Sequence, residues 1–183
     1  MRAVYWMFNV CMMVSPASFS GFDFAVPSEQ QAWKIINDNV MGGVSKGKVL
    51  VLKESLLFEG QLSLANNGGF ASLRSSFGEY DLSSFDGVEI ECRGSGGGFA
   101  LMLENQTMWF RPYFLGNFVP STEWQSIRVP FSAFNEYVIG QKKLTPLNKE
   151  FLSKVIRIGI FKGDKDTRPF QLELRSIQFY QNT

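Results

Sequence analysis

From Leu56 onward the chain consists of short runs in which apolar residues occupy every second position, separated by clusters of turn-forming residues. Such alternation is typical of β-strands that bury one face, whereas a helix repeats its apolar residues every three or four positions. The apolar positions are Leu56, Phe58, Leu62 and Leu64, then Val88, Ile90 and Cys92, and then Ile156, Ile158 and Ile160. The pattern predicts an all-β fold, a jelly-roll β-sandwich, in a single domain over 21–183.

The C-terminal run needs one irregularity to fit this pattern. Phe170, Leu172 and Leu174 share one parity, whereas Ile177 and Phe179 share the other. A β-bulge shifts the facing of later residues without ending the strand, so a one-residue bulge is predicted near 175–176. Helical signals are few, and only 28–33 and 148–153 are expected to form a short turn or two.

Two glycine pairs mark the tightest turns of the chain. Gly42-Gly43 and Gly68-Gly69 each lie among Asn, Asp or Ser residues and precede apolar residues. Glycine adopts positive φ without Cβ strain, and Asn or Asp side chains bond to nearby backbone in turns. Each stretch is therefore predicted to be a tight turn that leads into a strand, with positive φ at the glycines.

The residues around these pairs resemble the signature of the complex I intermediate-associated protein family. The matching segments are Trp33, NDNVMGGVS over 37–45, FEGQLSL over 58–64, NNGGFASLR over 66–74, WQSIRVPFSAF over 124–134, and 156–180. The signature residues in the two turns are Asn37, Asp38, Met41, Gly42, Gly43, Asn66, Asn67, Gly68 and Gly69. The resemblance covers nearly all of 22–180, and Arg168 departs from it where the family usually has glycine. It implies a galactose-binding-like β-sandwich and, in eukaryotes, a mitochondrial role in assembling respiratory complex I.

Composition argues against several classes of function. The 18 basic and 17 acidic residues give a net charge of +1 without a block of like charge, so no nucleic-acid partner is expected. The sequence has no histidine, which excludes Ser-His and Cys-His nucleophile pairs and removes the commonest general base. No other acid–base pair stands out, so the chain is predicted to be a non-enzyme without a cofactor. Cys92 alternates with buried positions and is predicted to be a small core residue.

Residues 1–20 differ from the rest of the chain. Arg2 precedes a mostly apolar run, Ala3 to Val14, which is followed by small residues up to Ser20. The run is shorter than the ~20 apolar residues that a membrane-spanning helix needs, but it fits a signal peptide. The alternative is an N-terminal extension that forms a strand or a loose tail. A signal peptide would place the protein in an exported or periplasmic location, and a eukaryotic family member would be mitochondrial.

No metal site is predicted. Asp164 and Asp166 flank Lys165 and could form one edge of a calcium site. Calcium takes about 6–8 oxygen ligands, and no further ligands accompany this pair in the sequence. A solvated turn is the simpler interpretation of the stretch.

Candidate binding residues come from the parity of two runs. Over 107–115 one face has Met108, Phe110 and Phe114, and the other has Trp109, Arg111 and Tyr113; over 124–129 the face opposite the core has Trp124, Ser126 and Arg128. Trp and Tyr stack on sugars or anchor protein partners, and Arg adds planar hydrogen bonding. Alternatively, these rings cover the second side of the sandwich. Pro112 cannot donate to a ladder, which predicts an edge or bulged strand.

Three functions remain open. The first is a non-catalytic protein-interaction or assembly module, whose partner the resemblance places in a membrane-associated respiratory complex. The second is a carbohydrate-binding module that holds a glycan on the Trp/Tyr/Arg face. The third is an enzyme, which the missing histidines disfavour. The chain itself is not expected to be transmembrane.

Overall fold

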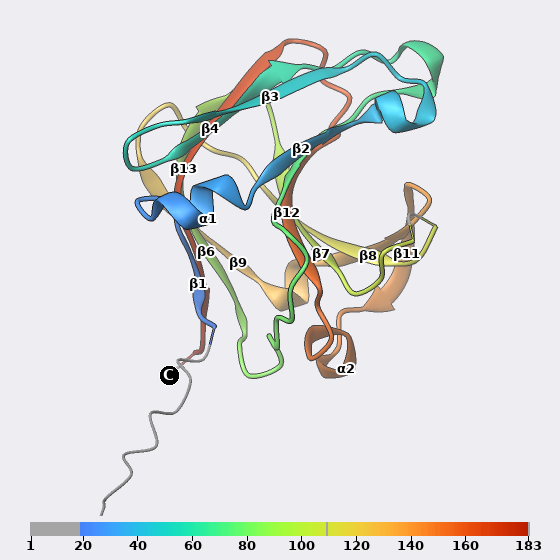
Figure 1. Ribbon diagram of the computed structural model, residues 1–183. Coiled ribbons are helices and arrows are strands. Elements are labelled where there is room, and N and C mark those ends of the chain that lie inside the picture. Colours follow the sequence, from blue (N-terminus) through green and yellow to red (C-terminus); the bar gives the residue numbers. More distant parts are fainter. Residues whose placement is uncertain (1–18, 109, 183) are drawn as a thin grey trace, which may run out of the picture.

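The computed structural model describes residues 19–108 and 110–182, so residues 1–18 of the predicted signal segment 1–20 lie outside the described residues, and the signal peptide stays a prediction. The described chain forms two antiparallel sheets (Figure 1). In the six-stranded sheet the order is β3-β4-β13-β6-β9, and β1 pairs with β13. Its strands are β1 (Gly21–Asp23), β3 (Lys46–Val51), β4 (Leu56–Gln61), β6 (Gly87–Ser95), β9 (Gln125–Pro130) and β13 (Pro169–Tyr180).

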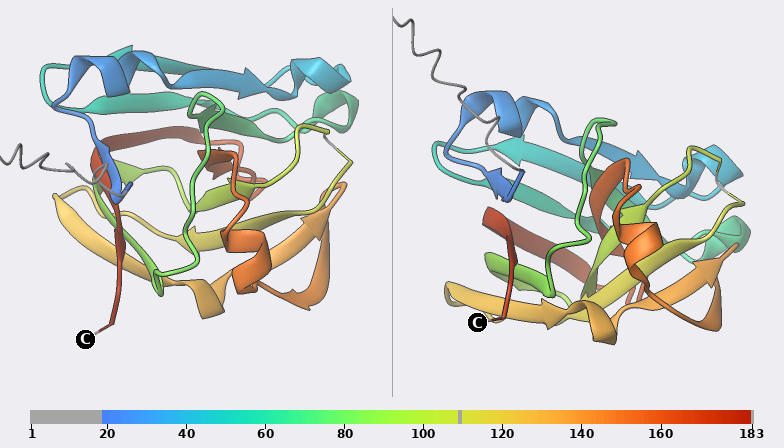
Figure 2. Two further views of the ribbon diagram at one scale, coloured as in Figure 1. Left: turned by 60° about the horizontal axis from the view of Figure 1, so that its bottom comes forward. Right: turned by 90° about the horizontal axis from the view of Figure 1, so that it is seen from below.

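The seven-stranded sheet has the order β11-β10-β8-β7-β12-β5-β2. Its strands are β2 (Lys34–Asn37), β5 (Ala71–Arg74), β7 (Phe99–Glu104), β8 (Tyr113–Phe118), β10 (Asn135–Val138), β11 (Gln141–Pro146) and β12 (Arg157–Lys162). The helices are α1 (Pro27–Gln31) and α2 (Lys149–Leu152), with 3-10 turns η1 (Asp38–Met41), η2 (Ala65–Asn67) and η3 (Phe131–Ala133). Figure 2 shows the resulting sandwich from two further directions. The all-β prediction is confirmed.

The main hydrophobic core lies between the sheets. At its centre Phe58, Phe99 and Phe170 contact one another edge to face, with ring centroids 5.0 to 6.4 Å apart. Cys92 is completely buried in this core, and burial followed by the charge of Glu91 raises the pKa of its thiol to about 12. The prediction that Cys92 is a small core residue is confirmed by its burial.

The strand predictions hold except at three places, one of which is Ile156, which precedes β12 and is only half-buried. The ladder between β13 and β6 shifts register between Leu174 and Ser176, which confirms the predicted bulge. Leu64 is wrong as a core position, because β4 ends at Gln61 and Leu64 is exposed. The strand expected over 107–115 begins only at Tyr113, because the described residues before it, 107–108 and 110–112, lie in bends, a turn or irregular structure.

The two signature turns are joined through the carboxylate of Asp38, which is almost completely buried. It accepts hydrogen bonds from the backbone N of Ser45 at 3.0 Å, the Ser45 hydroxyl at 2.6 Å, and the backbone N of Gly69 at 2.7 Å. Asn66 adds a second link by donating from Nδ2 to the carbonyl of Gly42 at 3.2 Å. Hydrogen bonds therefore join the two turns that contain the family-like signature into one folded unit.

The four signature glycines serve two different purposes. Gly42 and Gly69 adopt φ of 88° and 126°, as predicted for tight turns. Gly43 and Gly68 do not adopt positive φ, so that part of the prediction is wrong. A Cβ at either of these two positions would collide with the carboxylate of Asp38. Gly43 and Gly68 lack a side chain because the buried carboxylate of Asp38 occupies the space where a Cβ would lie.

The pKa of Asp38 gives a pH-dependent prediction. Burial raises this pKa, but the hydrogen bonds from Ser45, Gly69 and Phe70 outweigh burial and hold it below its ordinary value. Since the folded-state pKa lies below that of the unfolded chain, the carboxylate stabilises the fold above about pH 4, and this contribution is lost as pH falls through the folded-state pKa.

We therefore expect Asp38→Asn to lower the free energy of unfolding by about 2–4 kcal/mol at pH 7, because an amide nitrogen would face buried donors. The difference from the unmodified protein should shrink at about pH 3. Urea denaturation at both pH values checks this. Asp81→Asn is the matched control, since Asp81 also accepts from a serine but lies in an exposed turn, and should change little. Equal losses for both variants would contradict the prediction.

The glycine pairs allow a second test. Gly42→Ala introduces only backbone strain, since nothing lies within 4 Å of its Cβ position, and should cost roughly 1–2 kcal/mol. Gly43→Ala should cost more, because its Cβ displaces the carboxylate that accepts four hydrogen bonds. Equilibrium denaturation of the two variants gives the comparison. A smaller loss for Gly43→Ala than for Gly42→Ala would refute this explanation of the second glycine.

Candidate functional site

A groove with a volume of about 630 Å³ lies on the outer face of the seven-stranded sheet. Its floor comes from β2, β5, β7, β8 and β12, and its rim comes from the signature turns, the loop before β8 and the turn between β10 and β11. The lining residues are Ile36, Val40, Met41, Asn67, Phe70, Arg74, Met102, Glu104, Gln106, Met108, Arg111, Pro112, Tyr113, Ile139, Gly140, Arg157 and Phe161.

The groove floor exists because the outward positions of this sheet are apolar. In β8, Phe114 points into the main core, whereas Tyr113 and Leu115 point outward. Leu115 packs there with Ala100 and Met102 in a second hydrophobic cluster that lies apart from the main core. The outward face of a sheet that is solvated is normally polar, whereas here Ala100, Met102 and Leu115 are buried and give the groove an apolar floor.

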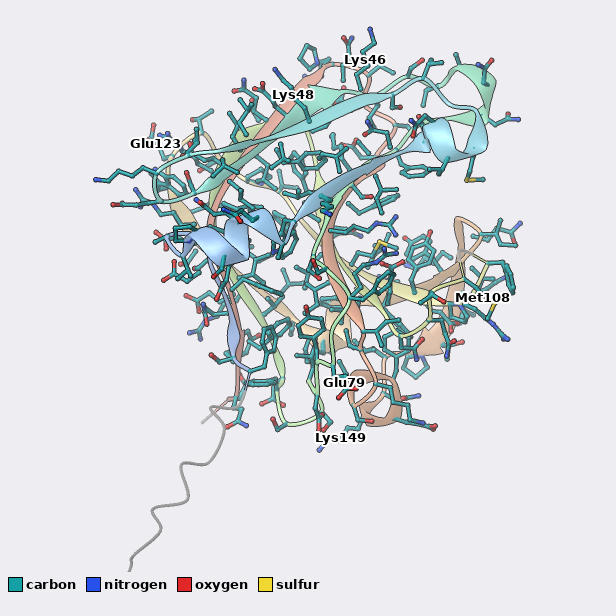
Figure 3. The ribbon with its side chains drawn as sticks, in the orientation of Figure 1. Lys46, Lys48, Glu79, Met108, Glu123 and Lys149 are labelled. Atoms are coloured by element: carbon teal, nitrogen blue, oxygen red, sulfur yellow. The ribbon has the colours of Figure 1, made fainter. Side chains whose placement is uncertain are left out.

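Apolar side chains also project from the rim. Val40, Met41 and Ile139 are 70%, 59% and 55% exposed, and Met108 is 43% exposed. Figure 3 labels Met108 on the loop at the right, across from the turn that contains Met41. Met41 and Asn67 belong to the family-like signature, so the signature turns form one side of the groove.

Three charged residues lie together at the groove floor. Arg157 in β12 donates from Nε and Nη2 to the two Glu104 oxygens at 2.6 and 3.0 Å, and Arg74 in β5 donates from Nη1 to Glu104 at 2.9 Å. Each of the three side chains is only 12% exposed. Burial, partly offset by Glu104, lowers the pKa of Arg74, and the neighbouring charge of Arg157 lowers it further. One carboxylate is thus shared by two guanidinium groups.

The outer face of the six-stranded sheet has a different character. Trp124 precedes β9, and its ring is covered by the guanidinium groups of Arg93 at 4.9 Å and Arg175 at 3.9 Å. Arg128 pairs with Glu89 at 2.5 Å and lies over the ring of Tyr180. The aromatic and charged groups on this face are therefore already engaged with one another.

The structure separates the four candidate binding residues that it describes. Arg111 and Tyr113 line the groove, whereas Trp124 and Arg128 lie on the opposite sheet. Trp109 lies outside the described residues. The expectation that Pro112 marks an edge or bulged strand is wrong, because Pro112 lies before β8, which pairs with both β7 and β10 without a register shift.

Sequence reasoning missed most of the groove. The floor residues Met102, Phe161, Arg74, Glu104 and Arg157 were not among the candidates, because only pairing of distant strands brings them together. In each strand the alternation of inward and outward residues places these side chains on the outward face, which gives no reason to single them out. The one available signal was that the outward residues of these strands include large apolar side chains.

The weak calcium candidates are engaged by side chains. The Lys162 ammonium is completely buried and contacts the Asp164 oxygens at 2.7 Å, the Gly96 carbonyl at 2.6 Å and the Gly98 carbonyl at 3.2 Å. Asp166 pairs with Arg168, whose hydrogen bonds lower the pKa of that carboxyl below its ordinary range. An internal ammonium thus occupies the oxygen-lined position. No group of three or more Asp, Glu, Cys or His that could hold a metal exists within residues 19–108 and 110–182.

Replacing Lys162 with Met should leave Asp164 and two carbonyls without their cation. We expect the free energy of unfolding to fall by about 3–5 kcal/mol, as for other broken buried ion pairs. Lys165→Met changes an exposed lysine in the same turn and serves as the control. Chemical denaturation that shows less loss for Lys162→Met than for Lys165→Met would contradict the assignment.

Several solved structures share this fold. The family 11 carbohydrate-binding module of the cellulase Lic26A-Cel5E of Clostridium thermocellum has a TM-score of 0.59 at 13% identity, covering 82% of this chain and 88% of that module. A structure of the family 11 module from Clostridium thermocellum with a β-1,3-1,4-mixed-linked tetrasaccharide gives 0.60 at 12% identity, covering 88% and 95%. The agarase AgWH50C gives 0.60 at 11% identity, covering 91% of this chain and 26% of the enzyme. The likeness confirms the jelly-roll β-sandwich fold.

The family assignment rests on sequence. No match was found among curated protein sequences. No helix in the described part of the chain is long and apolar enough to cross a membrane. The family model described as complex I intermediate-associated protein 30 (CIA30) matches residues 22–174. This match confirms the resemblance seen in the signature turns, and the chain belongs to the complex I intermediate-associated protein 30 family.

Proposed function

We propose that this chain is a non-catalytic assembly module that binds an apolar segment of a partner protein in the groove. The observation that supports this most is the methionine content of the groove. Met41, Met102 and Met108 are the methionines of the described residues, and all three line it. Methionine is unbranched and polarizable, so a surface rich in it adapts to apolar protein segments.

The rim supports a protein ligand as well. Exposed apolar side chains such as Val40, Met41 and Ile139 gain free energy when a partner removes them from water. The family match adds support, because its description names a complex I intermediate-associated protein. The partner we propose is accordingly a subunit of a membrane-associated respiratory complex.

The same groove argues against catalysis. Glu104 is the carboxylate among the lining residues, and two guanidinium groups engage both of its oxygens. A general base needs an accessible acceptor within reach of its substrate. With no histidine in the sequence, the groove has residues for binding rather than for proton transfer.

A glycan is the second candidate ligand. The fold is similar to that of a module solved with a bound tetrasaccharide, and Tyr113 presents an aromatic ring toward the groove. Its ring is stacked on that of Tyr137, with centroids 5.9 Å apart. Sugar rings stack on such aromatic faces. A glycan would use Tyr113 but would leave the exposed apolar rim without a role.

Site-specific photo-cross-linking in the native host tests the proposal. The full chain would be given a photo-reactive residue at Met108, on the rim, or at Lys48, which is exposed on the six-stranded sheet. Figure 3 labels both positions. We expect Met108 to cross-link to a defined segment of one protein, identified by mass spectrometry, and Lys48 not to. Tyr113→Ala should reduce the cross-linked product, with a loss of affinity of about 1–3 kcal/mol.

Two outcomes would contradict the protein-binding proposal. One is the same set of cross-linked proteins from both positions, which would mean that the groove has no preferred partner. The other is a specific oligosaccharide on a glycan array that the full chain retains and Tyr113→Ala does not, together with no cross-linked protein at Met108. That second result would establish the glycan as the ligand of the groove.

A further inference from the structure

The groove contains more positive charge than its one carboxylate neutralises. Its charged lining residues are Arg74, Arg111 and Arg157 against Glu104, a net charge of +2 among the described lining residues. The whole chain has a net charge of only +1. The excess is therefore concentrated at this surface, where apolar walls reduce the screening by water.

The two arginines at the floor are held in fixed positions with hydrogen-bonding capacity beyond their bonds to Glu104. Arg74 uses Nε to bind Ser72 at 2.9 Å and Nη1 to bind Glu104. Arg157 uses Nε and Nη2 for Glu104, and its guanidinium lies over the ring of Phe77 at 4.4 Å. A guanidinium has more N–H donors than these bonds use, arranged in a planar fork that suits a carboxylate.

From this geometry we infer that the protein segment bound in the groove has an acidic side chain that lies against Arg74 and Arg157, between apolar residues that contact the methionines. The inference rests on the proposed function and specifies the chemistry of its ligand. An incoming carboxylate would restore charge balance at a floor where one Glu serves two Arg residues. A purely apolar segment would bury that excess charge without compensation, which is costly.

Arg111 extends this preference to the rim. It lines the groove from the loop before β8 and is exposed, with its guanidinium over the ring of Phe110 at 5.7 Å. Exposed charges at a rim raise the association rate of an oppositely charged partner. The groove thus offers a positive entrance as well as a positive floor.

A displayed library of random peptides about 12 residues long, fused through their C-termini so that no free α-carboxylate is present, provides the probe. Peptides selected on the immobilised full chain would be kept if Tyr113→Ala weakens their binding, which places them in the groove. The tightest sequence would then be synthesised with an amidated C-terminus in two forms, one with its acidic residue and one with the matching amide.

We expect the selected peptides to share one Asp or Glu flanked by apolar residues. The amide form should bind about 10-fold more weakly or worse, the usual effect of losing a hydrogen bond to a charged group. Arg111→Gln should weaken binding of the acidic form several-fold, and Glu104→Gln should strengthen it. Arg128→Gln, on the opposite sheet, should change neither form.

The outcomes distinguish the inference from the proposed function. Groove-binding peptides whose acidic and amide forms bind equally would overturn the inference and leave the protein-binding function intact. The inference also fails, with that function intact, if Arg111→Gln and Glu104→Gln leave binding of the acidic form unchanged. A selection that yields no peptide dependent on Tyr113 would overturn both.

Discussion

The buried carboxylate of Asp38 is the interaction on which the groove depends. Its two oxygens accept hydrogen bonds from Ser45, Gly69 and Phe70, residues that enter β3 and β5 on different sheets. Without these bonds, several backbone and hydroxyl donors would be buried without a partner, which proteins rarely tolerate. The bonds also fix η1, so that Met41 projects over the floor of the seven-stranded sheet. The hydrogen bonds of Asp38, a signature residue, thereby position Met41 at the groove, the surface that we propose binds a partner.

The two outer faces of the sandwich show how one pattern gives two different surfaces. Both sheets alternate inward and outward residues, and both inner faces are apolar. On the six-stranded sheet the outward residues are ion pairs such as Arg93 with Glu173 and Arg175 with Glu91, which water can solvate. On the seven-stranded sheet they are apolar side chains around a charged triad in which the positive charge exceeds the negative. The second face combines exposed apolar groups at its rim with this charged triad, whereas the six-stranded sheet exposes apolar side chains at its edge strand β3, where Leu50 and Val51 lie.

The strand pattern was predictable from the sequence because alternation and burial follow local rules. The bulge in β13 and the core position of Cys92 were both predicted from the alternation of apolar residues alone. The groove was not predictable in the same way, because Arg74, Glu104 and Arg157 meet only when β5, β7 and β12 pair. Parity gave a wrong interpretation of 107–115, since the described residues 107–108 and 110–112 are not in a strand. A turn removes the alternation on which a face assignment depends.

The groove on the seven-stranded sheet is the surface that we propose binds the partner. Methyl-labelled methionine gives a direct measurement, because Met41, Met102 and Met108 report on the rim and the floor. Their resonances, assigned by single substitution, would be followed by NMR as the segment identified by cross-linking is added to the full chain. We predict that all three shift together in a saturable way, while backbone amides of β3 and β9 stay unchanged. Saturable shifts in β3 or β9 with the three methionines unmoved would contradict the claim.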